Sequence, residues 1–369
     1  MKKILFVVPE DYGFVSHRML LARKMISLGW KVVVSTRVNQ HADTIRESGV
    51  ELLTIGSTQD KRHSSSIKTI AKLINIYRHE RPDIVHHFTI RMVILGSIAA
   101  KFVKSQAVVN TITGLGSAFI YNGIKYRVIR CVVSAVLRIL LPSSIITVQN
   151  HDDYKFIKKL GISEEKIHLI LGSGVDVARY SPVKKNNQIP LVILPSRMLW
   201  VKGVGEFVEA ARVLKNQSIK CRCILVGDND DDNPASISNK QLSYWQDEGI
   251  VEWWGHSDDM EGVLSKADII CLPSYREGLP KSLLEAAASG LPIITTDVPG
   301  CREVVEHKVN GFLVPPQDYE NLVRTLKVLI EDKKIRLKMG KMGRKKALSE
   351  LSSAIIDHQK IDLYKAIKK

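Results

Sequence analysis

The sequence predicts an α/β protein made of two doubly wound, Rossmann-like domains in series. Short β-branched runs alternate with longer amphipathic segments, which is typical of parallel strands joined by crossover helices. This alternation stops at a polar stretch, 182–187, and then starts again. The length of 369 residues, with 45% hydrophobic residues, is enough for two buried cores. We therefore expect domains at 1–180 and 181–350, facing across a cleft, and a C-terminal crossover helix at 351–369 that returns to the first domain.

Six strands and two helices are predicted in the first domain from hydrophobic periodicity. The predicted strands are at residues 4–8, 31–35, 52–55, 84–87, 107–113 and 145–149. The predicted helices are at residues 17–28 and 66–79. Gly29 follows the first of them, where a glycine commonly ends a helix.

The second domain repeats the same alternation. Its predicted strands are at residues 191–195, 223–226, 250–254, 269–273 and 292–296. Helices are predicted between and after them at residues 205–215, 260–266, 281–288 and 319–331. Ligands of such sheets bind beyond the carboxyl ends of the strands, so the loops at those ends are the first place to look for a site.

Positive charge is concentrated in the first half. Residues 1–185 hold 28 basic and 13 acidic side chains, a net charge of +15, and the rest of the chain is close to neutral. Such an excess indicates a polyanionic partner (nucleic acid, anionic lipid or a phosphorylated substrate) or serves only solubility. Segment 124–141 is apolar with four basic residues, and it fits equally a helix on an anionic membrane and an ordinary sheet-covering helix.

Composition also excludes several classes of protein. Five cysteines form no CxxC pair, which favours a reducing compartment. No apolar run approaches the roughly 18 residues of a membrane span, and the N-terminal apolar run is too short for a signal peptide. We therefore expect a cytoplasmic protein.

The most specific motif lies between a strand that ends at Pro273 and a helix that begins after Pro280. Glu277 and Gly278 lie in the intervening loop, and Glu285 lies on the second turn of the helix. The free N–H groups of a helix start bind phosphate, and carboxylates accept hydrogen bonds from the vicinal hydroxyls of a sugar. The combination describes a nucleotide-sugar site. Alternatively, Glu277 only complements the helix dipole and Glu285 is an exposed helical residue.

A second motif, Arg197 to Gly203, follows the first strand of the second domain and so lies at the same sheet edge. Arg197 and Lys202 place two cations there, suited to a diphosphate. Taken alone, the loop is better explained by two solvated surface cations, but it shares its sheet edge with the Glu277 loop. The acidic run 228–233 lacks the glycine and glutamate of a calcium-binding loop, so we expect a solvated loop, no metal site and no cofactor.

The order and spacing of these motifs resemble the retaining glycosyltransferases of family 4, which have the two-domain GT-B fold. The resemblance is strongest over about 190–330, and the motifs that carry it are the Arg197–Gly203 loop, Val226-Gly227-Asp228, Trp254-Gly255-His256, Glu277 with Glu285, and Gly311 to Pro316. Within the family, the chain is most similar to bacterial enzymes that extend lipid-linked sugars for surface polysaccharides such as O-antigen or capsule.

The resemblance implies a role for each residue. Glu277, Arg197 and Lys202 would be catalytic, with the two cations on the donor diphosphate and Glu277 on the donor sugar. Glu285 would bind the ribose. The other donor-binding positions would be Gly278, Leu279, Pro280, Lys281, Gly255 and His256. No metal is needed for such an arrangement.

The acceptor site is less specific. Many family members carry a histidine after the strand that matches 107–113, whereas this sequence has Thr113 and Gly114 there. Gly13, His17 and Arg18, with His17 at the start of the first predicted helix, are the remaining acceptor candidates. A lone histidine at a helix start is more often a helix cap or a surface residue than a residue that contacts the acceptor.

These observations predict a retaining, metal-independent hexosyltransferase. It would transfer a hexose or N-acetylhexosamine from a nucleoside-diphosphate sugar, with UDP favoured, to a polyprenyl-diphosphate-linked saccharide. We expect a peripheral protein on the inner face of the cell membrane that binds an anionic surface and no nucleic acid. The alternatives are a glycosyltransferase with a soluble acceptor, a basic nucleic-acid-binding protein, and a non-catalytic sensor of nucleotide sugars.

Overall fold

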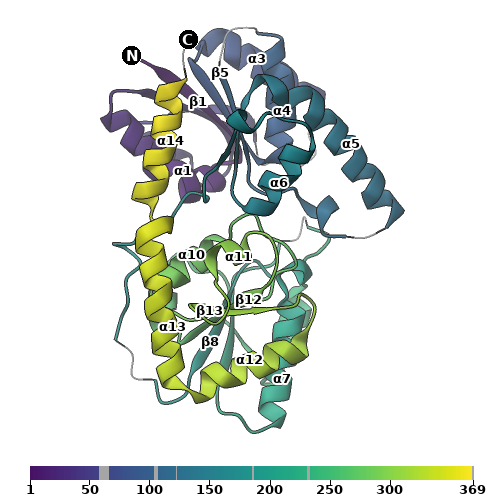
Figure 1. Ribbon diagram of the computed structural model, residues 1–369, viewed down its shortest axis with the longest axis vertical. Coiled ribbons are helices and arrows are strands. Elements are labelled where there is room, and N and C mark those ends of the chain that lie inside the picture. The colour runs from purple at the N-terminus through teal and green to yellow at the C-terminus, as the bar shows by residue number, and fades with distance from the viewer. Residues whose placement is uncertain (58–65, 104–106, 122, 185–186, 231–232, 368–369) are drawn as a thin grey trace. The chain divides into compact units, whose positions relative to one another are not determined.

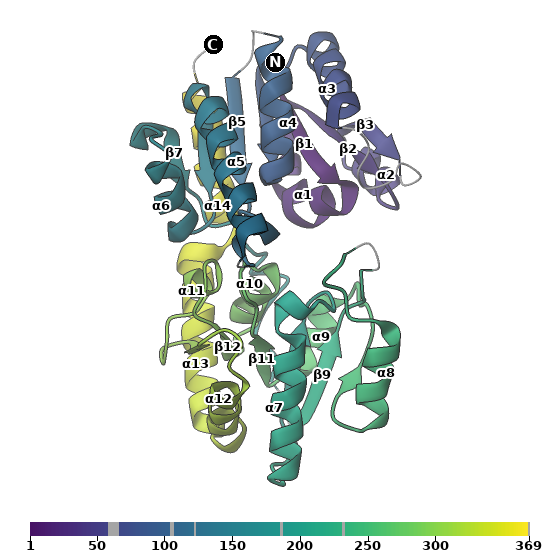
Figure 2. The same ribbon diagram turned by 90° about the vertical axis from the view of Figure 1, so that its right-hand side faces the viewer.

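The computed structural model describes residues 1–57, 66–103, 107–121, 123–184, 187–230 and 233–367. The chain divides into two compact units, the first made of 1–173 and 356–369 and the second of 174–355. Each unit is a parallel sheet with helices packed against it (Figures 1 and 2). This confirms the predicted fold class, including the return of the C-terminal helix to the first unit.

The first unit contains a seven-stranded sheet in the order β3-β2-β1-β4-β5-β6-β7. Its strands are β1 (Lys3–Glu10), β2 (Lys31–Val38), β3 (Glu51–Ser57), β4 (Ile84–Phe88), β5 (Ala107–Ile112), β6 (Ile145–Val148) and β7 (Ile167–Leu169). Its helices are α1 (Asp11–Ser27), α2 (Ala42–Glu47), α3 (Ser66–Glu80), α4 (Thr89–Lys101), α5 (Ile124–Leu140), α6 (His151–Lys159) and most of α14 (Ser353–Ala366), with short 3-10 turns at Ser117–Phe119, Leu141–Ser143 and Glu164–Lys166. β7 is a strand that the sequence analysis missed.

Alternating side chains of the central strands fill two cores on opposite faces of this sheet. Ile4 and Phe6 of β1 pack with α1, α2 and α14 on one face. Leu5 and Val7 pack with α3 and α4 on the other face. Because both faces of the sheet are covered, a central strand such as β1 must be apolar along nearly its whole length.

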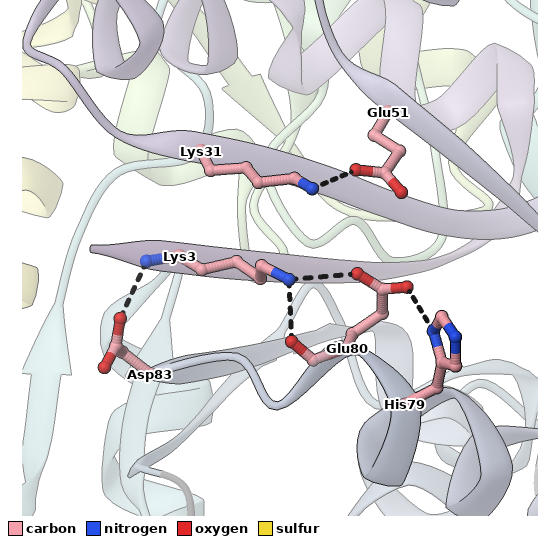
Figure 3. A network of polar contacts seen from close by, with 6 residues as sticks. All are labelled: Lys3, Lys31, Glu51, His79, Glu80 and Asp83. Carbon is pink, nitrogen blue, oxygen red and sulfur yellow. Dashed lines mark hydrogen bonds and ion pairs between the residues drawn. The ribbon is translucent and has the colours of Figure 1, made fainter. Parts of the chain in front are cut away.

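Polar contacts fix the amino-terminal ends of the strands in this unit (Figure 3). The Lys3 ammonium donates to the backbone carbonyl of Glu80 at 2.7 Å and pairs with its carboxylate at 3.1 Å, and the Lys3 backbone N–H donates to Asp83 at 2.8 Å. Lys31 of β2 pairs with Glu51 of β3 at 2.7 Å. Burial raises the pKa of Glu80, but hydrogen bonds from His79 and Lys3 outweigh it and hold that pKa below its usual value. The opposite, carboxyl edge is left for ligands.

Helix α14 brings ionisable groups into the interior of the first unit. Asp357 and Lys360 are at most 9% exposed and lie near the buried Arg18, and the Tyr364 hydroxyl contacts His86 Nδ1 at 2.7 Å. Burial lowers the pKa of Lys360 to about 7 and that of Arg18 to about 10, and it raises the pKa of Asp357 to about 6. The end of the chain is therefore part of the first core.

The second unit contains a six-stranded sheet in the order β10-β9-β8-β11-β12-β13. Its strands are β8 (Leu191–Pro195), β9 (Arg222–Val226), β10 (Glu252–Trp253), β11 (Ile269–Leu272), β12 (Ile293–Thr296) and β13 (Gly311–Val314). Its helices are α7 (Val204–Asn216), α8 (Asn239–Asp247), α9 (Met260–Lys266), α10 (Lys281–Ala288), α11 (Cys301–Val304), α12 (Tyr319–Glu331) and α13 (Lys333–Lys346), with a 3-10 turn at Trp200–Lys202 and a π turn at Ala347–Leu351. The prediction was correct to the residue for β8, α9, α10 and α12. It was wrong in extending β10 over five residues, and it missed α8, α11, α13 and β13.

Within the part of the chain that the structure describes, no helix has the length and apolarity needed to cross a bilayer.

Candidate active site

Two loops of the second unit meet at the carboxyl edge of its sheet. One follows β8 and the other follows β11, and these two strands are hydrogen-bonded neighbours at the centre of the sheet. The Tyr275 backbone N–H donates to the Val201 carbonyl at 2.9 Å and joins the loops directly. The prediction that the two motifs share one sheet edge is thus met by the geometry.

Gly203 permits this close approach. Its φ is +75°, and a Cβ at this position would lie 2.1 Å from the Pro273 carbonyl oxygen. Both the left-handed backbone and the contact exclude a larger residue. The glycine therefore brings the preceding residue, Lys202, against the loop that carries Glu277.

Lys202 and Glu277 form an ion pair at the centre of the site. The Lys202 Nζ lies 2.6 Å from Glu277 Oε1, and the side chains are 20% and 11% exposed. The Ser274 hydroxyl donates to the same carboxylate oxygen at 2.7 Å, and the Glu277 backbone N–H donates to the Pro299 carbonyl at 3.2 Å. Two of the three predicted catalytic residues are thus held together in one rigid arrangement.

Helix α10 begins directly after this loop. Gly278, Leu279 and Pro280 lead into Lys281, the first helical residue, and Pro280 offers no side-chain cap. The first N–H groups of a helix have no partner within it, so the mouth of α10 suits an anion. Gly300 packs closely against the loop before α10. A Cβ at position 300 would lie 2.5 Å from the Gly278 carbonyl oxygen, so this close packing requires a glycine.

Glu285 lies one turn into α10 and is 4% exposed, not the exposed helical residue that the alternative interpretation required. Its Oε1 is 3.3 Å from Lys281 Nζ. Burial raises the pKa of Glu285, although the Lys281 charge and a hydrogen bond from the Tyr180 hydroxyl oppose the rise. A buried carboxylate beside an anion-binding helix mouth can accept hydrogen bonds from a diol. Tyr180, which sequence reasoning missed, lies in the second unit, in the segment before β8.

Arg197 pairs with a different acidic residue from the one that Lys202 contacts. Its side chain is 57% exposed, and Nη1 donates to Asp230 Oδ2 at 2.6 Å. Asp230 belongs to the acidic run that we expected to be merely solvated, and that expectation is wrong for this residue because its side chain is only 12% exposed. Residues 231 and 232 of that run lie outside the described residues.

The loop after β10 contacts the loop after β9. The His256 backbone N–H donates to Asp228 Oδ1 at 2.9 Å, and the Gly227 N–H donates to the Gly255 carbonyl at 2.7 Å. The His256 ring is half-exposed and contacts Asp258 at 3.1 Å. Gly255 and His256 therefore belong to the same sheet edge as the site, and their role in donor binding stays a prediction.

The acceptor candidates lie in the first unit. Helix α1 begins at Asp11, so the expectation that His17 starts the helix is wrong: the strand before it ends at Glu10, and Gly13 and His17 are both within the helix. His17 Nδ1 lies 3.4 Å from the Ser173 hydroxyl.

The remaining acceptor candidates differ in exposure. Arg18 is 5% exposed, with its guanidinium 4.2 Å from the centre of the Phe88 ring, so it lies largely in the interior. Thr113 and Gly114 directly follow β5 at the carboxyl edge and are partly exposed. The acceptor roles of all five residues stay predictions.

Among the described residues, no three His, Cys, Asp or Glu side chains gather as a metal-binding group.

Comparison with known proteins identifies the family of each half. Residues 180–346 match the glycosyl transferases group 1, and residues 3–140 match the glycosyl transferase 4-like family. A Campylobacter jejuni protein named N,N'-diacetylbacillosaminyl-diphospho-undecaprenol alpha-1,3-N-acetylgalactosaminyltransferase is 27% identical over 97% of this chain and 99% of its own length. An Escherichia coli protein named UDP-Gal:alpha-D-GlcNAc-diphosphoundecaprenol alpha-1,3-galactosyltransferase is also 27% identical, over 78% of this chain and 77% of its own.

A solved structure supports the same fold. Anabaena HepE, crystallised with UDP-glucose, superposes with a TM-score of 0.80 at 18% identity and covers all of both chains. At this identity the likeness establishes the fold alone, and it agrees with the two parallel sheets described above. The two family matches together span most of the chain, and we conclude that this protein is a glycosyltransferase with the GT-B fold.

Proposed function

We propose that this glycosyltransferase moves a hexose or N-acetylhexosamine from a nucleoside-diphosphate sugar, with UDP favoured, to a polyprenyl-diphosphate-linked saccharide in bacterial surface polysaccharide or glycan synthesis. The observation that carries the proposal is the Lys202–Glu277 pair at the mouth of α10, with Glu285 buried on the same helix. Both relatives named above are named for transfer to a sugar on diphospho-undecaprenol, and one is named for a UDP-sugar donor.

The reaction requires stabilisation of the negative charge that develops on the leaving diphosphate. As the bond from the anomeric carbon to the diphosphate breaks, its electron pair leaves with the diphosphate. Lys202, Arg197 and the helix mouth of α10 stabilise that growing charge, and fixed charges do so without reorganisation at the moment of reaction. These groups supply the positive charge a metal ion would otherwise supply, so we propose that transfer needs no metal.

Glu277 and Glu285 recognise hydroxyl groups. Glu285 accepts hydrogen bonds from the ribose diol, and Glu277 accepts them from the donor sugar while Lys202 compensates its charge. Gly255 and His256 line the base.

Transfer proceeds with retention. The acceptor hydroxyl oxygen bonds to the anomeric carbon from the face that the diphosphate leaves, and its proton passes to a diphosphate oxygen. The oxocarbenium-like transition state places positive charge between Glu277 and the leaving group.

The membrane side of the proposal rests on α5. Ile124, Val128, Val132 and Ile139 are 80%, 56%, 56% and 68% exposed, although each is a large apolar side chain. Their spacing places them in one stripe along the helix. Within α5, only Leu137 and Leu140 are buried.

Basic side chains flank the α5 stripe. Lys125 lies along one border, and Arg127 and Arg138 lie along the other, as helical spacing dictates. An ordinary sheet-covering helix would bury its apolar stripe, whereas this arrangement suits the surface of an anionic bilayer. We propose that α5 holds the enzyme on the inner face of the cell membrane, where a lipid-linked acceptor lies.

The test is a transfer assay with UDP-, GDP- and ADP-sugars and polyprenyl-diphosphate saccharides extracted from membranes. Lys202→Ala should lower kcat roughly 100-fold or more, because it removes a preorganised charge from the transition state. Lys327→Ala is the matched control, since Lys327 pairs with Glu331 on α12 of the same unit, outside the site. Unchanged transfer by Lys202→Ala, or no transfer by the wild type with any donor, would overturn the proposal.

The same assay examines the finer claims. Activity that survives EDTA supports the metal-independent mechanism, and activity restored only by a divalent ion rejects it. The anomeric configuration of the product, read by NMR, distinguishes retention from inversion.

A further inference from the structure

Two aromatic side chains stand together at the carboxyl edge of the first sheet. Tyr12 follows β1, His41 follows β2, and these two strands pair in parallel. Their ring centres are 5.7 Å apart with a 45° angle between the planes. Tyr12 is 56% exposed, so its ring faces solvent at the edge where ligands of parallel sheets bind.

A buried carboxylate holds the two loops in place. Asp11 is completely buried, and its Oδ1 accepts the backbone N–H of Tyr12 at 2.7 Å. Its Oδ2 accepts the backbone N–H groups of Asn39 at 2.6 Å and His41 at 3.1 Å. Burying a charge is unfavourable unless it is hydrogen-bonded. Two of these three bonds come from the backbone of Tyr12 and His41, whose rings are exposed and partly buried respectively, so Asp11 fixes the two rings relative to each other.

The surroundings of the pair match the chemistry of a sugar. One face of a pyranose carries C–H bonds that pack against an aromatic ring, and its edges carry hydroxyl groups. Asn39 and Gln40, exposed on the loop before His41, present amides that both donate and accept hydrogen bonds. The carboxylate of Asp11 beneath the pair disfavours an anionic ligand such as a diphosphate.

We propose that Tyr12 and His41 form a saccharide-binding platform that receives a sugar ring of the acceptor, with Asp11 as its positioning residue. The inference rests on the proposed function, since it identifies part of the acceptor site for that reaction. It adds to the predicted acceptor residues a pair of side chains that no sequence motif indicated. Gly13, the next residue on α1, borders the platform.

The test separates acceptor binding from donor binding. We expect Tyr12→Ala to raise the acceptor KM about tenfold, with kcat and the donor KM within twofold of the wild type. Tyr244→Ala is the matched control, because Tyr244 has the same exposed fraction of 56% but lies on α8 of the second unit. Thermal unfolding checks that both variants fold.

A direct binding measurement keeps the inference testable if transfer is not observed. The saccharide is released from the lipid carrier by mild acid and titrated calorimetrically into the wild type, Tyr12→Ala and Tyr244→Ala. Weaker binding by Tyr12→Ala alone supports the platform even where the proposed transfer fails. Equal binding by all three proteins, no binding by the wild type, or a rise in the donor KM instead of the acceptor KM would overturn it.

Discussion

The contact at Gly203 allows a quantitative prediction about the active-site loop. In Gly203→Ala the new Cβ would lie 2.1 Å from the Pro273 carbonyl oxygen, at a φ of +75°. The left-handed backbone costs a residue with a Cβ roughly 1–2 kcal/mol. Forcing an extra methyl group into a packed site costs roughly 1–3 kcal/mol more. We therefore expect the free energy of unfolding to fall by about 2–5 kcal/mol.

A second glycine of the same unit separates the two contributions. Gly249 also has a positive φ, +64°, but the nearest atom to a Cβ there is Lys215 Nζ at 3.3 Å, the end of a flexible side chain. Gly249→Ala should cost only the backbone contribution, about 1–2 kcal/mol. Urea denaturation of both variants measures the difference.

The transfer assay adds a functional readout. To relieve the contact, the loop that carries Lys202 must move away from Glu277, so Gly203→Ala should also lose transfer activity, whereas Gly249→Ala should keep it. Equal destabilisation of the two variants would show that the Pro273 carbonyl oxygen does not obstruct a Cβ at position 203, and would refute the reasoning.

Three further predictions concern pH and the membrane. Because burial holds the pKa of Glu285 above its usual value, the acid limb of the pH–rate profile should lie above the roughly 4.3 of an ordinary glutamate, and Glu285→Gln should lower activity and remove that limb. The pKa of Glu80 is lowered in the folded protein, so the Lys3–Glu80 pair stabilises the fold at pH values above the ordinary glutamate pKa. This stabilisation is lost as the pH falls through the lowered pKa of Glu80. In denaturation experiments at a series of pH values, the free energy of unfolding should therefore decrease less steeply towards acid pH for Glu80→Gln than for the wild type. Replacing Val128 and Val132 on α5 by Asp should abolish flotation with anionic liposomes while leaving thermal stability unchanged, and co-flotation of that variant would contradict the role of α5.

Most of the fold was predictable because strand and helix periods differ and recur along the chain. Helix α13 escaped prediction because it does not pack through an apolar stripe. Its buried residues are Met339, Gly340 and Gly343, and a Cβ on Gly340 would lie 2.0 Å from the Gly290 carbonyl oxygen. Close backbone packing of this kind leaves no hydrophobic period to detect.

The sequence predicted only those contacts of the site that follow from the order of the strands, because loops that follow neighbouring parallel strands lie side by side. Lys202 and Glu277 follow neighbouring strands of a parallel sheet, so their meeting could be expected from topology. The Arg197–Asp230 pair and the Tyr180–Glu285 hydrogen bond could not, because each joins loops whose approach depends on tertiary packing. Three residues separate Asp230 from the end of β9, and in the sequence this segment has the composition of an ordinary solvated loop.

The place of α14 in the first unit has a consequence for how the protein is made. Ile361 and Tyr364 of α14 complete the hydrophobic core that contains Ile4 and Phe6 of β1, so this core needs both β1 and α14. When only the first half of the chain has been synthesised, α14 is missing, and one face of the first sheet is incompletely covered. The second unit, by contrast, is contiguous in sequence, and all of its residues precede the part of α14 that belongs to the first unit. Folding of the first unit can therefore be completed only after α14 has been synthesised, later than that of the second unit.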